Sequence, residues 1–392
     1  MTMKQTQTKL FDFSDVGLDF CAGSKNLFPD RFKKMFTLGY NVQTVASVAV
    51  TGNQVVLTYG VSHGYVADRV LKITSGALAA INDGEFWIDA VTANTVTLTI
   101  DDAPISVAGG FVTKIASLGW SLEYENSNIH VYKLKALDES NVYLRICFQN
   151  NLSLANYVSP CLGDTFDQAT GFITDADSIS STKNINTPNL DFHWMYSGWA
   201  TSNDANYNYQ QGYPWWGKGV IIGSAYHFVS MHQHYNSGTP QRLCGVLPVI
   251  SILSNLKKHI IIGEKRQSVV VGEAMIGAFQ AFIGDVRVAL SHFSTQDLTY
   301  PVAVSGVLPD RIDGQNTTMC RPLLVSEYST RQFLGVVMGV YEVCYGSNNS
   351  PILHYQNQPN QSKDIDLNNN VFVQTFGSNA WWCVPVEEIK IA

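Results

Sequence analysis

Apolar and polar residues alternate along most of this chain, and this period of two constrains the fold more than any other feature of the sequence. Successive side chains of a β-strand point to opposite faces of a sheet, so a two-residue period predicts half-buried strands. The runs are rich in β-branched and aromatic residues and are separated by turn-forming Gly, Asn, Asp and Ser. The clearest runs are residues 54–59, 95–100, 128–134, 141–148, 220–231 and 259–262.

Helical periodicity is confined to four short segments, residues 30–35, 249–256, 273–282 and 326–333. Each of them also suits a strand or a loop. The chain lacks the regular strand–helix alternation of a parallel α/β sheet, and it shows no heptad, collagen triplet or longer repeat. We therefore expect an all-β protein built from antiparallel sheets.

The length of 392 residues predicts two or three domains. Residues 43–118 have the character of a separate module, because turn sequences at 51–53 and 82–84 divide them into hairpin-like pairs. Residues 119–392 are expected to form a large antiparallel β-sandwich, and residues 1–42 a segment that packs on it. The expected architecture is a β-sandwich main domain with a small β-barrel-like module near the N-terminus.

The surface of this protein is expected to carry few charges. Asp, Glu, Lys and Arg make up 15% of the residues, against about 25% in typical soluble proteins. Burying an amide or hydroxyl at an interface costs less than burying a charge, so the composition favours a protein covered by other subunits. A monomeric extracellular lectin or enzyme is the alternative. The net charge of −7, without a dense basic cluster, argues against nucleic-acid binding.

The sequence also predicts the compartment in which the chain assembles. The first fifteen residues lack the apolar stretch of a secretory signal. The most apolar window, residues 269–284, is interrupted by Glu273 and Gln280, so we expect no membrane span. Seven cysteines at wide, irregular spacing predict reduced, buried thiols rather than disulfides or a zinc site. Together these features indicate assembly in a cytosol.

Two stretches resemble phage proteins. The segment of residues 61–100, with His63-Gly64-Tyr65 and the turn at 82–86, resembles a small β-domain named after the first catalytic-cysteine half-domain of ubiquitin-activating enzymes. That domain recurs in phage tail and fibre proteins, and no cysteine lies in this segment, so the resemblance implies no ubiquitin transfer. The rest of the chain is similar, more loosely, to virion structural proteins of tailed phages, through the pattern at 223–228.

The resemblance implies a structural component of a tailed-phage virion, in the tail or baseplate. Its expected partners are other virion structural proteins and further copies of itself in a homo-oligomer. Its expected location is the virion, after assembly in the host cytoplasm. A receptor- or carbohydrate-binding protein of the tail tip, fibre or head is the alternative.

The strongest candidate for a contact site is a group of aromatic residues interleaved with Asn and Asp between residues 193 and 216. Aromatic faces stack on sugar rings while amides and carboxylates bind hydroxyls, so a host-surface glycan is one candidate ligand. Tyr and Trp also anchor protein interfaces, and we favour that interpretation. The candidate contact residues are Trp194, Trp199, Tyr207, Tyr209, Tyr213, Trp215 and Trp216.

Patterns for metals and catalysis are weaker. His232 and His234 alternate as on one face of a strand, with His193 or His227 as a third metal ligand, although surface or interface histidines that form hydrogen bonds with their neighbours are the simpler interpretation. Residues 364–368 begin like a calcium loop but lack its Gly and Glu. Motifs for nucleophilic, phosphate or dinucleotide chemistry are missing. We predict no metal, cofactor or enzymatic activity; a polysaccharide depolymerase with paired carboxylates is the third hypothesis.

Overall fold

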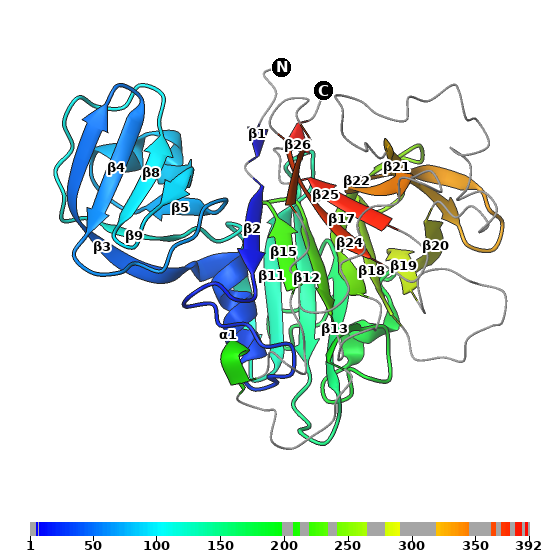
Figure 1. Ribbon diagram of the computed structural model, residues 1–392. Helices are drawn as coiled ribbons and strands as arrows, with labels where there is room; N and C mark the ends of the chain where they lie inside the picture. Colours follow the sequence, from blue (N-terminus) through cyan, green and yellow to red (C-terminus); the bar gives the residue numbers. More distant parts are fainter. Residues whose placement is uncertain are drawn as a thin grey trace.

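The computed structural model describes residues 5–6, 8–197, 207–211, 219–233, 241–264, 279–290, 319–344, 362–365, 370–376, 381–385 and 389–390. Strands make up 48% of the structure and helices 9%, which confirms the predicted all-β class. All strand pairings among the described residues are antiparallel. Figure 1 shows a small module beside a larger body of stacked sheets.

The small module is a seven-stranded sheet that closes on itself. Its strands are β3 (Tyr40–Thr51), β4 (Gln54–Tyr59), β5 (Val70–Ile73), β6 (Glu85–Trp87), β7 (Ala90–Val91), β8 (Thr95–Thr99) and β9 (Val112–Ile115). Their spatial order is β6-β5-β9-β3-β4-β8-β7, so two strands adjacent in sequence, β6 and β7, lie at opposite edges. Between them, Ile88 N donates to Arg69 O and Asp89 N donates to Thr97 O. The bent segment 85–91 therefore joins both edges into the predicted barrel-like module.

Two turns of this module depend on glycine. Gly84 follows two residues that also have positive φ and itself has a φ of +70°. A Cβ added to Gly84 would lie 2.4 Å from the backbone oxygen of Ile73, far inside van der Waals contact. Gly52, in the turn between β3 and β4, has a similar φ of +60° but nothing within 4 Å of such a Cβ.

We expect Gly84→Ala to destabilise the protein by roughly 2–3 kcal/mol, because left-handed strain and a backbone clash act together. Gly52→Ala is the matched control and should cost only the strain, about 1 kcal/mol. Urea denaturation followed by tryptophan fluorescence measures both. Equal costs for the two variants would contradict the role of the Ile73 carbonyl.

Two sheets face each other in the larger body (Figure 1). The first contains, in spatial order, β10 (Ser121–Asn126), β11 (Ile129–Lys135), β12 (Asn141–Phe148), β13 (Asn156–Gly163) and β14 (Trp194–Ser197). The second begins with β2 (Lys9–Asp12), β15 (Gly219–Gly223), β16 (Phe228–Gln233), β17 (Gln241–Ser251) and β18 (His259–Glu264). Trp194 packs on Phe228 across the interface at 5.5 Å, and its indole N–H donates to Ile262 O at 2.8 Å. These contacts define the predicted β-sandwich.

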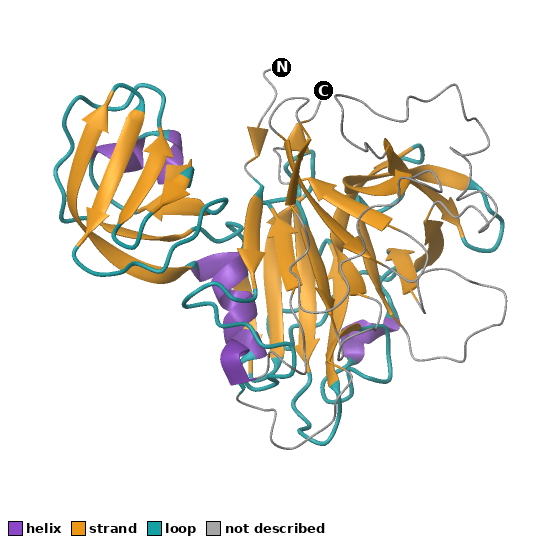
Figure 2. Ribbon diagram, viewed as in Figure 1, coloured by secondary structure: helices purple, strands orange, loops and turns teal. Residues whose placement is uncertain are grey.

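A short helical segment near the N-terminus fills one end of the sandwich (Figure 2). It consists of α1 (Phe28–Lys33) and a π-helical turn, η1 (Lys34–Leu38), and agrees with the helical signal at residues 30–35. Phe28, Phe32 and Phe36 recur every four residues, so they share one face. Phe32 contacts Phe148 of the first sheet and Phe228 of the second, with centroids 5.3 and 5.9 Å away. The N-terminal segment thus completes the core.

The second sheet also contains a closed ring of six strands that the sequence did not predict. After β17 and β18 it is formed by β19 (Phe279–Ile283), β20 (Val286–Leu290), β21 (Met319–Glu327) and β22 (Phe333–Cys344). Strand β17 pairs with β18 through residues 245–248 and with β22 through residues 249–251, which closes the ring. Its interior is apolar and includes Leu247, Leu323 and Val337. We call this unit the C-terminal barrel.

The remaining elements are short. They are β1 (Gln5–Thr6), η2 (Ala77–Ala80), η3 (Asn82–Gly84), η4 (Ser180–Lys183), β23 (Ser362–Ile365), β24 (Asn370–Phe376), β25 (Trp381–Pro385) and β26 (Ile389–Lys390). Strands β25, β24 and β23 continue the second sheet from β22, and β1 pairs with β26. Across the described ranges, no helix has the length and apolar character needed to cross a membrane.

Several sequence predictions need correction. The run at 220–231 is a hairpin of two strands, β15 and β16, rather than one strand. The helical signal at 249–256 covers the end of β17 and a turn, and that at 326–333 covers the turn between β21 and β22. Residues 279–282 of the third signal belong to strand β19, and the rest of that signal lies outside the described residues. In each case pairing with neighbouring strands overrides a weak local helical pattern.

Candidate functional site

The structure describes three residues of the predicted aromatic contact site, Trp194, Tyr207 and Tyr209. Trp194 is wrong as a contact residue, because its side chain is fully buried between the two sheets. Tyr207 and Tyr209 are half-buried and pack against the sandwich core. Tyr209 N donates to the carboxylate of Asp19 at 2.7 Å, which fixes this segment to the N-terminal region. The other four candidates, Trp199, Tyr213, Trp215 and Trp216, lie outside the described residues.

The histidine proposed as a metal ligand on β16 is part of the core. His232 stacks on Tyr196, with ring centroids 4.3 Å apart. Its Nδ1 lies 3.0 Å from Ser230 Oγ and its Nε2 lies 2.9 Å from Met195 O, so both ring nitrogens have protein partners. His234 lies outside the described residues. In the ranges that the structure describes, no three side chains of the metal-ligating types are grouped as a site.

Two serine–histidine pairs have the spacing of a nucleophile and its base but are inaccessible. Ser224 Oγ lies 2.8 Å from His227 Nδ1, and Ser230 Oγ lies 3.0 Å from His232 Nδ1. All four side chains are buried, with the serines fully enclosed. Catalysis requires that a substrate reach the nucleophile, so these pairs support the core rather than a reaction.

A buried ion pair joins the module to the sandwich. Arg69, directly before β5, donates through Nε and Nη2 to the two carboxylate oxygens of Asp15, at 2.8 and 2.9 Å. Tyr40 donates its hydroxyl to the same carboxylate at 2.7 Å. Burial alone would lower the pKa of Arg69, but the Asp15 carboxylate outweighs it and raises that pKa. Burial and the same carboxylate raise the pKa of Tyr40 well above its usual value.

A second polar contact reinforces the junction. Lys9 on β2 forms an ion pair with Glu85 on β6 at 2.8 Å, and its ammonium also donates to Ser117 O. Burial lowers the pKa of Lys9 even though Glu85 opposes that shift. Val16 also lies against Gly64, within about 3 Å of where a Cβ would stand. Two ion pairs, Asp15–Arg69 and Lys9–Glu85, therefore join the module to the sandwich at separate points.

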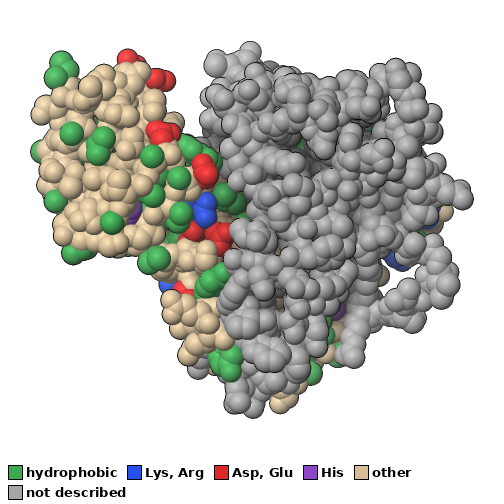
Figure 3. All heavy atoms as spheres, in the orientation of Figure 1, with side chains coloured by type: hydrophobic (Ala, Val, Ile, Leu, Met, Phe, Trp, Pro, Cys, Tyr) green, Lys and Arg blue, Asp and Glu red, His purple; other side chains and the backbone are tan. Residues whose placement is uncertain are grey.

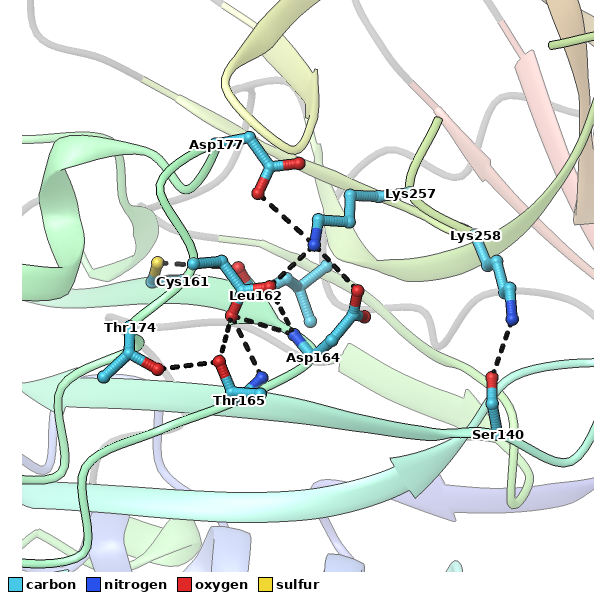
Figure 4. Close-up of polar contacts among 10 residues, drawn as sticks. Ser140, Cys161, Leu162, Asp164, Thr165, Thr174, Asp177, Lys257 and Lys258 are labelled. Carbon is cyan, nitrogen blue, oxygen red and sulfur yellow. Dashed lines mark hydrogen bonds and ion pairs between the residues drawn. The ribbon is translucent and has the colours of Figure 1, made fainter. Parts of the chain in front are cut away.

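A third cluster fastens the long loop after β13 to the turn before β18 (Figure 4). Lys257 contacts three carboxylates, at 2.7 Å from Asp164, 2.6 Å from Asp175 and 3.3 Å from Asp177. Asp175 also accepts hydrogen bonds from the backbone N–H groups of Asp164 and Thr165. Burial disfavours the charge on Asp175, yet hydrogen bonds from Lys257 and these backbone groups lower its pKa. The geometry is that of a clamp between the sheets.

An exposed apolar surface lies on the outside of the C-terminal barrel. Ile250 on β17 is paired with Val336 on β22, which is paired with Leu324 on β21, so the three side chains form a row across adjacent strands. Ile252 follows directly after β17, and its N–H donates to Leu334 O at 2.9 Å. An irregularity in the pairing of β21 with β22 brings Phe333 opposite Ser326, beside Leu324. The exposed fractions are 55% for Ile250, 61% for Ile252, 40% for Leu324 and 41% for Phe333. We call these five apolar residues the barrel row.

Basic residues border the barrel row at the turn between β21 and β22. Two guanidinium groups contact the ring of Tyr328, with Arg287 Cζ 3.7 Å and Arg331 Cζ 5.1 Å from its centroid. Glu327 is the acidic residue of this turn, and it accepts hydrogen bonds from the backbone N–H groups of Thr330 and Ser329. A hydrogen bond from the Thr330 side chain, together with these backbone bonds, lowers the pKa of Glu327 to about 2.

Sequence reasoning missed both the junction and the barrel row. Asp15 and Arg69 are 54 residues apart, and neither lies in a motif. The barrel row depends on the register of three strands, which the sequence does not specify. Comparison with known proteins adds no assignment: no family model, curated protein or solved structure matches this chain. The fold and its contacts define a class, an all-β protein of linked barrel and sandwich units.

Proposed function

We propose that this chain is a structural assembly protein that holds neighbouring subunits in fixed register. The observation that carries the proposal is the buried Asp15–Arg69 pair, which ties the module to the sandwich. A subunit can set the spacing of its neighbours only if its own parts do not move relative to one another. The exposed barrel row and the low charge of the chain support the same function, because both favour burial against other proteins.

The particular assembly that we propose is the virion of a tailed phage, at the tail or baseplate. This step rests on the resemblance of residues 61–100 and 223–228 to phage structural proteins. The barrel-like closure of the module is compatible with that resemblance. Other virion proteins and further copies of the chain are the proposed partners.

Mass spectrometry of purified phage particles tests this function. We expect the chain in particles washed with concentrated salt, at a constant ratio to the major tail protein, because interfaces with buried apolar cores resist screening. A non-structural protein of the same phage is the control and should be lost in the wash. A chain that is abundant in the infected cell but lost from washed particles would contradict the proposal.

A further inference from the structure

The barrel row is an exposed apolar surface of the kind that proteins bury against a partner. It consists of four apolar residues on three neighbouring strands and of Ile252, which directly follows β17; four of these five side chains are at least 40% exposed. Single exposed apolar residues are ordinary, but contiguous apolar strips on a folded protein mark contact sites. Arg287 and Arg331 give one end of this strip a positive edge. Its partner should therefore present an apolar side chain with acidic neighbours.

The module carries such a feature on the loop of residues 101–110, between β8 and β9. Ile105 on this loop is 97% exposed, the highest value among the large apolar side chains of the described residues. Asp101 and Asp102 precede it, and both are exposed. The loop is held against β3, since Gly110 N donates to Val45 O at 2.7 Å. Figure 3 shows acidic and hydrophobic side chains on the surface of this module. We call residues 101–110 the module loop.

The two surfaces lie at opposite ends of the molecule (Figure 1), with the module at the left and the hairpin of β21 and β22 at the right. Because the junction fixes the module, the module loop of one chain cannot reach the barrel row of the same chain. Two different, complementary surfaces at opposite ends suit contacts between successive copies. Such heterologous contacts produce rings when the rotation closes and filaments when it does not.

We propose that the module loop of one copy docks on the barrel row of the next copy, with Ile105 against Leu324 and Val336 and with the two aspartates facing the arginine edge. This inference rests on the proposed assembly function and adds its partner, a second copy of the chain, and its head-to-tail geometry. Apolar contact supplies the affinity, while the opposite charges set the orientation.

Sedimentation velocity of the purified full chain over a range of concentrations tests the docking. We expect wild-type protein to form oligomers larger than dimers. Ile105→Lys and Leu324→Glu should each shift assembly to concentrations roughly tenfold higher or more, because each places a charge in an apolar contact. Leu190→Lys is the matched control: Leu190 is 66% exposed and belongs to neither surface, so its oligomers should be unchanged. Circular dichroism verifies that the variants are folded.

A mixture of the two variants gives the sharper result. Ile105→Lys keeps an intact barrel row, and Leu324→Glu keeps an intact module loop. Mixing them leaves one productive contact per pair, so we expect dimers and nothing larger. Contact between two barrel rows would instead leave Ile105→Lys fully able to assemble on its own, and mixing would give no dimer that contains both variants, which would overturn the proposal.

The other outcomes are also decisive. A wild-type chain that stays monomeric at every concentration, although present in washed particles, overturns this inference and leaves the assembly function in place. Oligomers that neither Ile105→Lys nor Leu324→Glu weakens would also overturn this inference and leave the assembly function in place. If the chain is both monomeric and absent from particles, the proposed function fails as well.

The charges can be tested separately. Asp102 and Arg331 both have positive φ, at 58° and 62°, so asparagine is the substitution that retains the backbone best. We expect Asp102→Asn and Arg331→Asn each to weaken assembly and to reduce its sensitivity to salt. The double variant should be little weaker than either single variant, since both changes remove one shared attraction. Strictly additive effects would overturn the proposed orientation of the aspartates toward the arginine edge.

Discussion

Replacing Arg69 with methionine is expected to lower the free energy of unfolding by about 3–5 kcal/mol. The substitution leaves the Asp15 carboxylate buried with only Tyr40 and backbone groups as hydrogen-bond partners. Removing one member of a buried pair costs more than the pair contributes, because the remaining charge stays away from water. Urea denaturation measures the loss. The double change Asp15→Leu with Arg69→Met should recover much of it, since no isolated charge then remains.

An exposed ion pair supplies the control for this experiment. Lys33 and Glu125 are 2.6 Å apart, with side chains 24% and 44% exposed. Lys33→Met should therefore cost no more than about 1 kcal/mol. Equal costs for Lys33→Met and Arg69→Met would show that burial of the junction pair has no special weight. That result would contradict the proposed role of the Asp15–Arg69 junction as a rigid link.

Acidification is expected to destabilise the protein well above the pH at which most carboxylates titrate. Burial lowers the pKa of His227 to about 3, with His259 adding to the shift. Burial also lowers the pKa of His259 to about 4 and that of His130 to about 4, although nearby carboxylates oppose both shifts. In the unfolded chain each imidazole has a pKa near 6.5. The unfolded state therefore binds more protons between about pH 6.5 and pH 4.

Proton linkage gives the direction and the size of this change in stability with pH. Stability contributed by these neutral histidines is complete above about pH 6.5 and decreases as the pH falls, by about 1.4 kcal/mol per pH unit for each histidine. Asp138 and Glu327, whose pKa values are lowered to about 2, lose their contributions only nearer pH 4 and below. The urea midpoint should hence drop steeply from pH 6.5 to pH 4.5. His227→Leu should reduce that slope by about one third, whereas an unchanged slope would exclude His227 as a cause.

The sequence predicted strands best where alternation was strict. Residues 54–59 and 141–148 correspond to β4 and β12. The side chains of β4 alternate between a buried and a less buried face, whereas β12 is buried on both faces from Leu144 to Phe148. The run at 220–231 was taken as one strand because both halves of a tight hairpin are apolar. Its turn, Ser224-Ala225-Tyr226, carries no Gly or Pro. The Ser224 hydroxyl holds the turn, because it lies 2.8 Å from His227 Nδ1 and accepts a hydrogen bond from Tyr226 N. Local turn chemistry therefore gave no signal.

The candidate site was harder to predict because it depends on contacts that are distant in sequence. Trp194 has the composition of a binding residue, but register with β13 and the approach of Phe228 place it in the core. The barrel row shows the opposite case. Its residues have the composition of a core, and the irregular pairing near residue 326 leaves Phe333 on the outside. Burial of an apolar residue is decided by the pairing of strands, which a single sequence does not reveal.

The bent segment 85–91 has one more consequence for how other proteins can bind the module. Open sheets end in strands whose unpaired N–H and C=O groups recruit a strand from another chain. Within the fully described module, the β6 part of this segment pairs with β5 and its β7 part pairs with β8. The segment therefore covers the edges of both β5 and β8. A protein that binds the module must consequently contact its side chains, because it cannot add a strand to these edges. For the same reason, neighbouring copies of the module cannot pair edge to edge into a continuous sheet.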